Sequence, residues 1–259
     1  MSKNRICILN AVIDCFTMDE TVNEVDQYIT ERKPLHLMGV NADKINMLNK
    51  NEHIKKIVNG CGIINADGAS VVLASRYLNC QLPERVAGID LMQNLIELAE
   101  RKNYSVYFLG AKNDVVKKTA QVLESKHPKL KIVGTHDGYF KEDQWIEIVQ
   151  ILKEKNPQII FVGITSPLKE YLIEYLQNEG LNSVFMGVGG SFDVIAGYIH
   201  RAPLWMQIIN LEWLFRVIQE PRRLFKRYLI GNCQFIIAIY FEKRRSNEKL
   251  NYNRLKVRK

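Results

Sequence analysis

The feature that most constrains the fold is a regular alternation of short apolar runs with longer amphipathic stretches. The apolar runs, which we expect to be strands, occupy residues 5–9, 35–40, 62–65, 105–110, 131–134, 158–163 and 184–186. The stretches with helical spacing of apolar residues occupy 18–29, 54–58, 71–77, 90–101, 114–126, 142–155 and 168–178. Runs that are apolar at nearly every position are typical of parallel strands buried on both faces. The sequence therefore predicts an α/β fold, a Rossmann-like parallel sheet covered by helices on both faces.

The charge of the chain is concentrated at its C-terminal end. The 259 residues carry a net charge of +8. Residues 216–259 hold thirteen Lys and Arg against three Glu, a net charge of +10, which leaves −2 for residues 1–215. We therefore divide the chain into a Rossmann-like domain, 1–203, and a basic, amphipathic helical appendage, 204–259, in which 205–218 is one amphipathic segment. A basic tail of this kind binds phosphates, of nucleic acid or of a membrane surface.

The apolar run 228–241 helps to decide whether the basic tail binds nucleic acid or a membrane surface. It is shorter than the roughly 20 residues that a membrane span requires, and basic residues flank it on both sides. This pattern favours an interfacial helix on anionic lipid. A nucleic-acid-binding module would use the interleaved aromatic residues for stacking, but 235–241 is too apolar for a solvated RNA-binding face. A buried terminal helix or a contact in a homo-oligomer is the remaining alternative.

The cysteines and the N-terminus indicate a reduced, cytoplasmic chain. The five cysteines are scattered and show no metal-ligand spacing. The first residues, MSKNR, begin no long apolar run, so we expect no signal peptide.

Polar and glycine residues gather where the predicted strands end. They lie in the segments 41–43, 66–68, 109–111, 137–139, 163–167 and 187–190. Ligands bind beyond the carboxyl ends of the strands in parallel sheets, so we expect a pocket at this edge. The turn containing Gly187, Gly189 and Gly190 precedes a helix, which suits an anion, although an ordinary strand–helix corner has the same composition.

Several common site patterns are missing from the sequence. A dinucleotide-binding G-x-G-x-x-G is ruled out because Phe192 stands at the third glycine position. The chain also lacks a P-loop, G-x-S-x-G, H-E-x-x-H and a D-x-D pair for a metal–diphosphate. The sequence thus favours a phosphate-bearing ligand held by backbone and arginine, with no metal and no cofactor. Asp67, at a strand end, is either a helix N-cap or a general base.

The segments at the strand ends, taken together, resemble the WecG/TagA/CpsF family of bacterial glycosyltransferases. The matching pieces, in chain order, are 41–42, 66–68, 84–91, 108–110, 138–140, 166–167, Glu170, 187–197, 201–203, 211–213 and 220–222. The resemblance implies inverting transfer of a sugar from a UDP-sugar to an undecaprenyl-diphosphate-linked saccharide at the inner face of the plasma membrane. The sugar would be N-acetylmannosamine or a related one, such as its uronic acid or glucose, and the product a cell-surface polysaccharide or teichoic acid.

The resemblance also assigns roles to residues. Asp67 matches the proposed general base. The donor and its nucleotide would be bound by Asn41, Gly110, Tyr139, Lys169, Glu170, Gly187, Gly189, Gly190, Phe192 and Asp193. The lipid diphosphate of the acceptor would be bound by Arg85, Arg201, Arg216 and Arg222. A non-catalytic membrane-surface protein is the alternative to an enzyme, and turnover of a UDP-sugar distinguishes the two.

The chain departs from the family pattern at positions that bear on the site. Lys169 stands where the family has glutamine, and Gly39 stands where some members have threonine. Lys169 either favours a carboxylated sugar or points outward from its helix.

Overall fold

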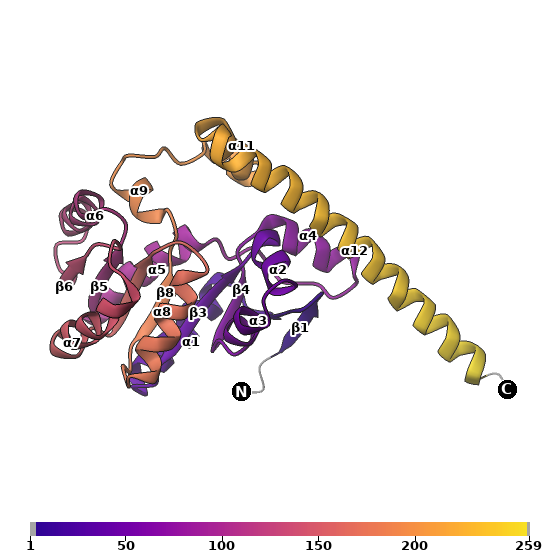
Figure 1. The fold of residues 1–259 in the computed structure, drawn as a ribbon, viewed down its shortest axis with the longest axis horizontal. Helices are drawn as coiled ribbons and strands as arrows, with labels where there is room; N and C mark the ends of the chain where they lie inside the picture. The colour runs from indigo at the N-terminus through magenta and orange to yellow at the C-terminus, as the bar shows by residue number, and fades with distance from the viewer. Residues whose placement is uncertain (1–3, 258–259) are drawn as a thin grey trace.

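Six parallel strands form the central sheet of the computed structural model, which describes residues 4–257 apart from the side chains of 223, 226, 227 and 249–257. Their order is β4-β3-β8-β7-β5-β6. The strands of this sheet are β3 (Leu35–Val40), β4 (Ile63–Ala66), β5 (Ser105–Gly110), β6 (Lys131–His136), β7 (Ile159–Gly163) and β8 (Val184–Gly187). The predicted Rossmann-like parallel sheet is therefore confirmed (Figure 1).

Helices connect the strands and continue into the C-terminal appendage (Figure 1). They are α1 (Met18–Thr30), α2 (Ala42–Leu48), α3 (Glu52–Asn59), α4 (Ala69–Tyr77), α5 (Gly88–Lys102), α6 (Asn113–Lys126), the 3₁₀ turn η1 (Glu142–Gln144), α7 (Trp145–Lys155), α8 (Leu168–Asn178), α9 (Ser191–Ile195), α10 (Leu204–Ile208), α11 (Glu212–Gln219) and α12 (Pro221–Val257).

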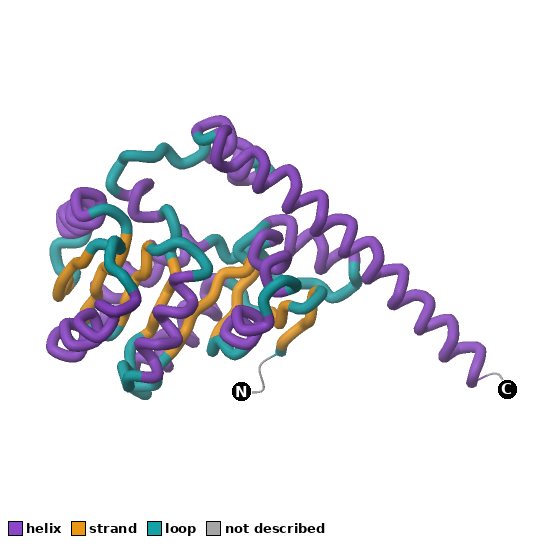
Figure 2. Tube along the Cα trace, viewed as in Figure 1, coloured by secondary structure: helices purple, strands orange, loops and turns teal. Residues whose placement is uncertain are grey.

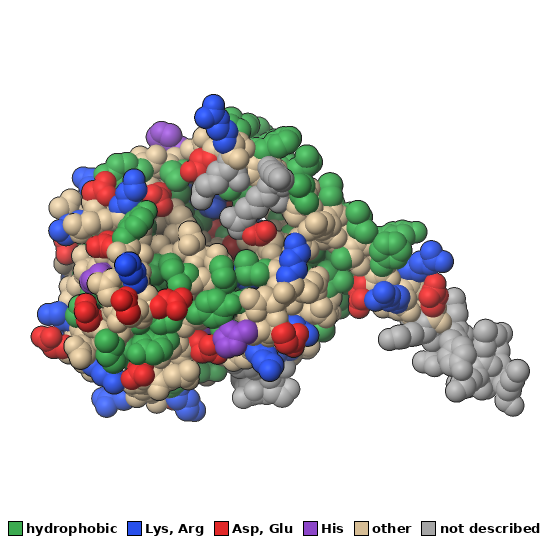
Figure 3. Space-filling view, in the orientation of Figure 1, with side chains coloured by type: hydrophobic (Ala, Val, Ile, Leu, Met, Phe, Trp, Pro, Cys, Tyr) green, Lys and Arg blue, Asp and Glu red, His purple; other side chains and the backbone are tan. Residues whose placement is uncertain are grey.

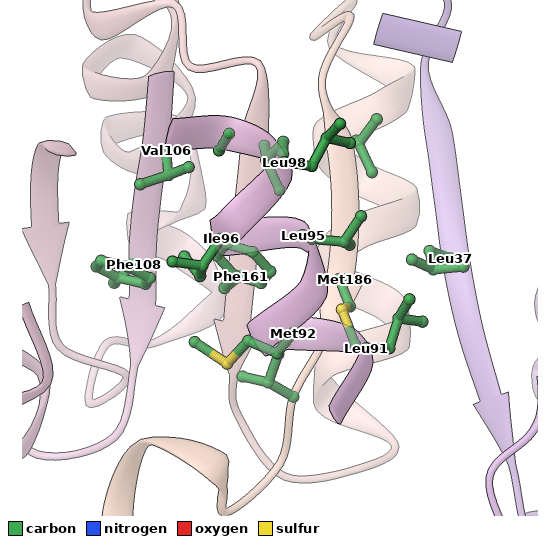
Figure 4. Close-up of a cluster of buried hydrophobic side chains, with 14 of the residues drawn as sticks. Leu37, Leu91, Met92, Leu95, Ile96, Leu98, Val106, Phe108, Phe161 and Met186 are labelled. Atoms are coloured by element: carbon green, nitrogen blue, oxygen red, sulfur yellow. The ribbon is translucent and has the colours of Figure 1, made fainter. Parts of the chain in front are cut away.

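Hydrophobic side chains cover both faces of the sheet. On one face, Leu95 and Ile96 of α5 pack with Phe108, Phe161 and Met186 from the middle strands (Figure 4). Helices α1 and α6 belong to the same cluster. Helices α2, α3 and α4 bury their apolar residues in a second cluster, and α7 and α8 in a third. Burial on both faces explains why the strands are apolar at nearly every position.

The N-terminal segment differs from the prediction of one strand over 5–9. It forms a separate antiparallel hairpin of β1 (Arg5–Ile8) and β2 (Ala11–Asp14). Leu9 has a φ of 55°, which turns the chain back after β1. Asp14 attaches the hairpin to the body, since its carboxylate accepts a hydrogen bond of 2.8 Å from the Ile64 N–H.

The predicted amphipathic segment 205–218 is also interrupted. It forms the two helices α10 and α11, because Asn210 adopts a left-handed conformation with a φ of 62° between them. The irregular stretch between α9 and α10 carries the chain from the body to the appendage (Figure 2).

The apolar run 228–241 lies within α12, and Gly231 does not interrupt the helix. Gly231 faces α2, where its carbonyl accepts a hydrogen bond of 2.8 Å from Asn46 Nδ2. Phe235 and Ile239 are buried in the cluster that includes α2 and α4. Burial of a side chain of this size stabilises the docked helix by about 1.5–3 kcal/mol. One face of the run is thus a packed terminal helix, as the alternative interpretation expected.

The opposite face of the appendage is apolar and exposed. Figure 3 shows hydrophobic side chains along the outer edge of α12. The exposed large apolar residues of α10 to α12 and the turns between them are Leu204, Trp205, Ile208, Ile209, Trp213, Ile218, Phe225, Leu229, Ile230, Ile236, Ile237, Tyr240 and Phe241. Across residues 4–257, no helix combines the length and apolarity that a membrane span would need.

Candidate functional site

The carboxyl ends of the strands place the predicted site residues in a row. From one edge of the sheet to the other, Asp67 follows β4, Asn41 follows β3, Gly187 ends β8, Gly110 ends β5 and Tyr139 follows β6. Neighbouring strands lie about 4.8 Å apart, so the five spacings put Tyr139 about 24 Å from Asp67 along the row. The sheet brings the first three together and leaves Tyr139 at the far edge, where its side chain is 74% exposed.

Asp67 is fixed by its own backbone and by the start of α5. Its N–H donates to the Val40 carbonyl at 2.9 Å, and its Oδ1 accepts from the Gly88 N–H at 2.9 Å. Gly88 is the first residue of α5, while the helix that follows Asp67, α4, has Gly68 as its N-cap. The N-cap interpretation of Asp67 is therefore wrong for α4. Among the residues whose side chains the structure describes, none donates a hydrogen bond to Oδ2.

Asp67 packs closely against Gly39 of β3. A Cβ at position 39 would lie 3.2 Å from the Cβ of Asp67, closer than most real contacts. A larger residue here would press on the carboxylate's own side chain, so this departure from the family pattern leaves room beside Asp67.

A buried charged cluster lies beside Asn41. Asn41 is the N-cap of α2, with its Oδ1 accepting from the Lys44 N–H at 2.9 Å. The Lys44 Nζ donates to Glu170 Oε1 at 2.7 Å and to Ser166 Oγ at 2.8 Å. Glu170 is fully buried, and its Oε2 has no hydrogen-bond partner among the described residues.

The second lysine of this cluster, Lys169, lies inward. Its Nζ is 3.6 Å from Glu170 Oε1, and its side chain is 12% exposed. A Cβ at Gly187 would lie 2.7 Å from the Lys169 side-chain carbons, so the lysine crosses the end of β8. Burial alone would raise the pKa of Glu170, but Lys169 and Lys44 lower it below its ordinary value. Burial lowers the pKa of Lys44, and Glu170 opposes that change.

Glycines allow close approach at two strand ends. Gly110 has a φ of 129°, and a Cβ there would lie 2.5 Å from the Gly163 carbonyl carbon. Gly189, in the turn before α9, has a φ of 52°. Gly190 is the N-cap of α9, and Asp193 is in its first turn. The positive φ values explain glycine at 110 and 189, whereas Gly190 has a φ of −83° and room for a Cβ.

Phe192 is a core residue. It is fully buried, stacks edge-on against Phe108 and lies under Gly163. Its carbonyl accepts a hydrogen bond of 3.0 Å from Thr119 Oγ1. The Phe192 side chain therefore packs in the core next to the end of β7.

Three of the four predicted arginines meet at one carboxylate, Glu212. Arg85 Nη2 lies 3.0 Å from Glu212 Oε2, Arg216 Nη2 lies 3.4 Å from Oε1, and Arg201 Nε lies 4.0 Å from Oε1. Arg85 Nε also donates to the Asp67 carbonyl at 2.7 Å. The fourth, Arg222, is exposed in the first turn of α12. We call Arg85, Arg201, Arg216 and Glu212 the arginine cluster.

Sequence reasoning missed or misplaced three partners in this region. Asp90 was expected at the start of a helix over 90–101, but α5 begins at Gly88, and Asp90 pairs with Arg201 at 2.7 Å. Glu212 lies in a matching segment but carried no predicted role. Lys44 was missed as well; the one sequence signal for it was its position three residues after Asn41, at the predicted end of a strand. None of the histidines, cysteines and acidic residues in the described part of the chain form a group of three or more that could hold a metal ion.

A parallel α/β sheet with a carboxylate and several cations at the carboxyl ends of its strands is typical of enzymes that bind anionic ligands at this edge. The sequence pattern of the glycosyl transferase WecG/TagA/CpsF family matches residues 6–249. The N-acetylglucosaminyldiphosphoundecaprenol N-acetyl-beta-D-mannosaminyltransferase of Bacillus subtilis (strain 168) is 35% identical over 202 residues, which cover 78% of this chain and 78% of that protein. The chain belongs to the WecG/TagA/CpsF family of glycosyltransferases, as the sequence segments indicated.

Proposed function

We propose that this glycosyltransferase moves a sugar from a UDP-sugar to an undecaprenyl-diphosphate-linked N-acetylglucosamine, with inversion at the anomeric carbon. Asp67 Oδ2 takes the proton of the acceptor hydroxyl. The acceptor's hydroxyl oxygen then bonds to the anomeric carbon of the donor sugar, and the bond between this carbon and the UDP oxygen breaks. The name of the Bacillus subtilis relative supports the acceptor and an N-acetylmannosamine-type sugar.

The contact between Asp67 and the arginine cluster is the observation that carries this proposal. Arg85 touches the Asp67 carbonyl at 2.7 Å and Glu212 at 3.0 Å. A lipid diphosphate bound at the arginine cluster would therefore hold its sugar beside the general base. Arginine suits this task because its planar guanidinium can bind phosphate oxygens in pairs.

The donor would lie along the row of strand ends, on the side of Asp67 opposite to the arginine cluster. We assign Asn41, Lys169 and the turn with Gly187, Gly189 and Gly190 to the sugar and diphosphate. The end of β5 at Gly110 and the more distant Tyr139 fit the nucleoside end, because a UDP-sugar is an elongated ligand. Lys169, inward and next to Gly187, would meet an anionic group of the donor.

We propose that the appendage holds the enzyme at the inner face of the plasma membrane. Its exposed apolar residues and the +10 charge of residues 216–259 fit an anionic lipid surface. A lipid-linked acceptor would then be available without leaving the membrane. A second copy of the chain is the alternative to lipid as the partner of the exposed apolar face of the appendage.

A panel of UDP-sugars offered with a short-chain polyprenyl-diphosphate-N-acetylglucosamine tests the function. Product mass identifies the sugar transferred, and addition of a chelator tests whether a metal is needed. We expect transfer of an N-acetylmannosamine-type sugar and no effect of the chelator. No transfer from any UDP-sugar would favour the non-catalytic membrane-surface protein instead.

A further inference from the structure

Glu212 joins segments that are far apart in the sequence. Its side chain is 7% exposed, and its carboxylate lies between guanidinium groups from the body and from α11. Arg85 lies 127 residues before it. Three guanidinium groups held this close would repel one another without a shared carboxylate. Glu212 is therefore the residue that keeps the arginine cluster together.

Two routes connect Glu212 to the candidate base. The first runs through Arg85, which contacts both Glu212 and the Asp67 carbonyl. The second runs through Arg201, which pairs with Asp90 of α5 at 2.7 Å. Gly88, the first residue of α5, in turn donates its N–H to Asp67 Oδ1. Both the backbone and the carboxylate of Asp67 are thus linked to the position of α11.

A buried N–H of the arginine cluster leaves room for an anion. The guanidinium groups of Arg85, Arg201 and Arg216 form their ion pairs with two carboxylates, those of Glu212 and Asp90. Arg201 Nε is buried and has no hydrogen-bond partner among the described residues. Its 4.0 Å separation from Glu212 Oε1 is too long for a hydrogen bond.

We propose that Glu212 is a positioning residue, which docks α11 and holds three arginines in the arrangement that binds the diphosphate of the acceptor. It does not touch the reacting atoms; it acts through Arg85 and Arg201. This role rests on the proposed function, because it assigns the acceptor diphosphate to the arginine cluster.

The test compares Glu212→Gln with Glu212→Asp in the full chain. Gln keeps the size of the side chain but loses the charge, whereas Asp keeps the charge. Hydrogen bonds to charged groups contribute about 1.5–3 kcal/mol, so the expected rise in acceptor KM for Glu212→Gln is roughly ten- to a hundredfold. We expect donor affinity to change less than about twofold, and Glu212→Asp to recover part of the loss.

Asp14→Asn is the matched control for loss of a buried ion pair. Asp14 is buried and pairs with Arg5 at 2.8 Å in the β1–β2 hairpin. This variant should lower the melting temperature without raising the acceptor KM. If Glu212→Gln lowers the melting temperature but leaves the acceptor KM unchanged, the role of Glu212 is structural and the inference is wrong.

Binding of inorganic pyrophosphate to the full chain gives a readout that does not need turnover. Glu212→Gln should weaken this binding by roughly tenfold or more. Tighter binding would show that Glu212 competes with the diphosphate, and unchanged binding would show that it does not arrange the arginines; either result overturns the inference. If the wild type binds pyrophosphate in this Glu212-dependent manner but transfers no sugar, the proposed function fails and the inference on the arginine cluster stands.

Discussion

At the scale of the residue, Asp67 is placed by main-chain contacts that a substitution would preserve. The Asp67 N–H and carbonyl do not depend on the side chain, and an asparagine oxygen can still accept from the Gly88 N–H. We predict that Asp67→Asn folds and binds UDP but loses turnover by about 10²–10⁴, because the amide cannot take a proton. Circular dichroism, UDP titration and kcat check this, with Asp26→Asn in α1 as the control. A folded Asp67→Asn enzyme with near-normal kcat would leave Asp67 as a structural anchor of α5.

Lys169 carries the second prediction at this scale. It is held inward between Glu170 and the end of β8, so its charge reaches the row of strand ends. We predict that Lys169→Gln shifts preference among UDP-sugars away from carboxylated and toward neutral ones. Competition between the two donor types in one reaction measures this directly. Lys102→Gln, at the end of α5, is the control; the same donor profile in both variants would show that Lys169 does not contact the sugar.

At the scale of the element, β3 carries a histidine that cannot easily take up a proton. Burial lowers the pKa of His36 to about 3, and the nearby Lys169 and Lys44 act in the same direction while Glu170 opposes them. Below pH 6.5 the unfolded chain binds a proton at His36 that the folded chain does not bind. The free energy of unfolding therefore falls as the pH drops from 6.5 toward 3, by up to about 1.4 kcal/mol per pH unit.

The variant His36→Leu isolates this contribution. We predict that the free energy of urea unfolding of the wild type falls by about 1.6 kcal/mol between pH 6.5 and 5, and that the variant loses clearly less. This range lies above the ordinary pKa of carboxylates, so Glu170 adds little there. Parallel pH curves for the two proteins would show that His36 becomes protonated within the fold.

The elements also show where sequence patterns are sufficient. Strand β3 and helix α8 have the bounds that periodicity predicts, because burial on one or both faces fixes their apolar spacing. The β1–β2 hairpin was missed because it turns at Leu9, a residue that rarely adopts positive φ. Gly231 stays within helix α12, and its carbonyl accepts a hydrogen bond from Asn46 of α2, a contact that only the tertiary structure reveals.

At the scale of the whole molecule, the candidate site depends on contacts that no local pattern contains. The strand-end residues were predictable, since parallel strands all end at one edge of the sheet. The arginine cluster was not, because Arg85 and Glu212 are separated by 127 residues and their pairing depends on how α11 docks. The family resemblance supplied the arginines but not the carboxylate that gathers them.

The appendage as a whole has one face docked on the body and one exposed. Because Phe235 and Ile239 are buried, cutting the chain before Arg216 would uncover part of the core. Substitution of the exposed face is therefore the cleaner test of membrane binding. The variant Ile236→Ser/Ile237→Ser/Phe241→Ser removes apolar side chains that are 51–63% exposed. Ile146→Ser in α7, where the side chain is 45% exposed, is the matched control.

We predict that the wild type sediments with anionic vesicles at low salt and is released as salt rises. Each basic residue near an anionic surface contributes about 1 kcal/mol, and this attraction falls off within a Debye length, about 10 Å at 0.1 M salt. Insertion of the exposed apolar side chains adds to this attraction, so the triple variant should bind roughly tenfold or more weakly while Ile146→Ser binds like the wild type. The triple variant should still use a short-chain, water-soluble acceptor. Undiminished vesicle binding by the triple variant would show that these side chains do not insert into lipid. If the wild type forms a dimer that the same substitutions dissociate, a second copy of the chain covers this face instead of lipid.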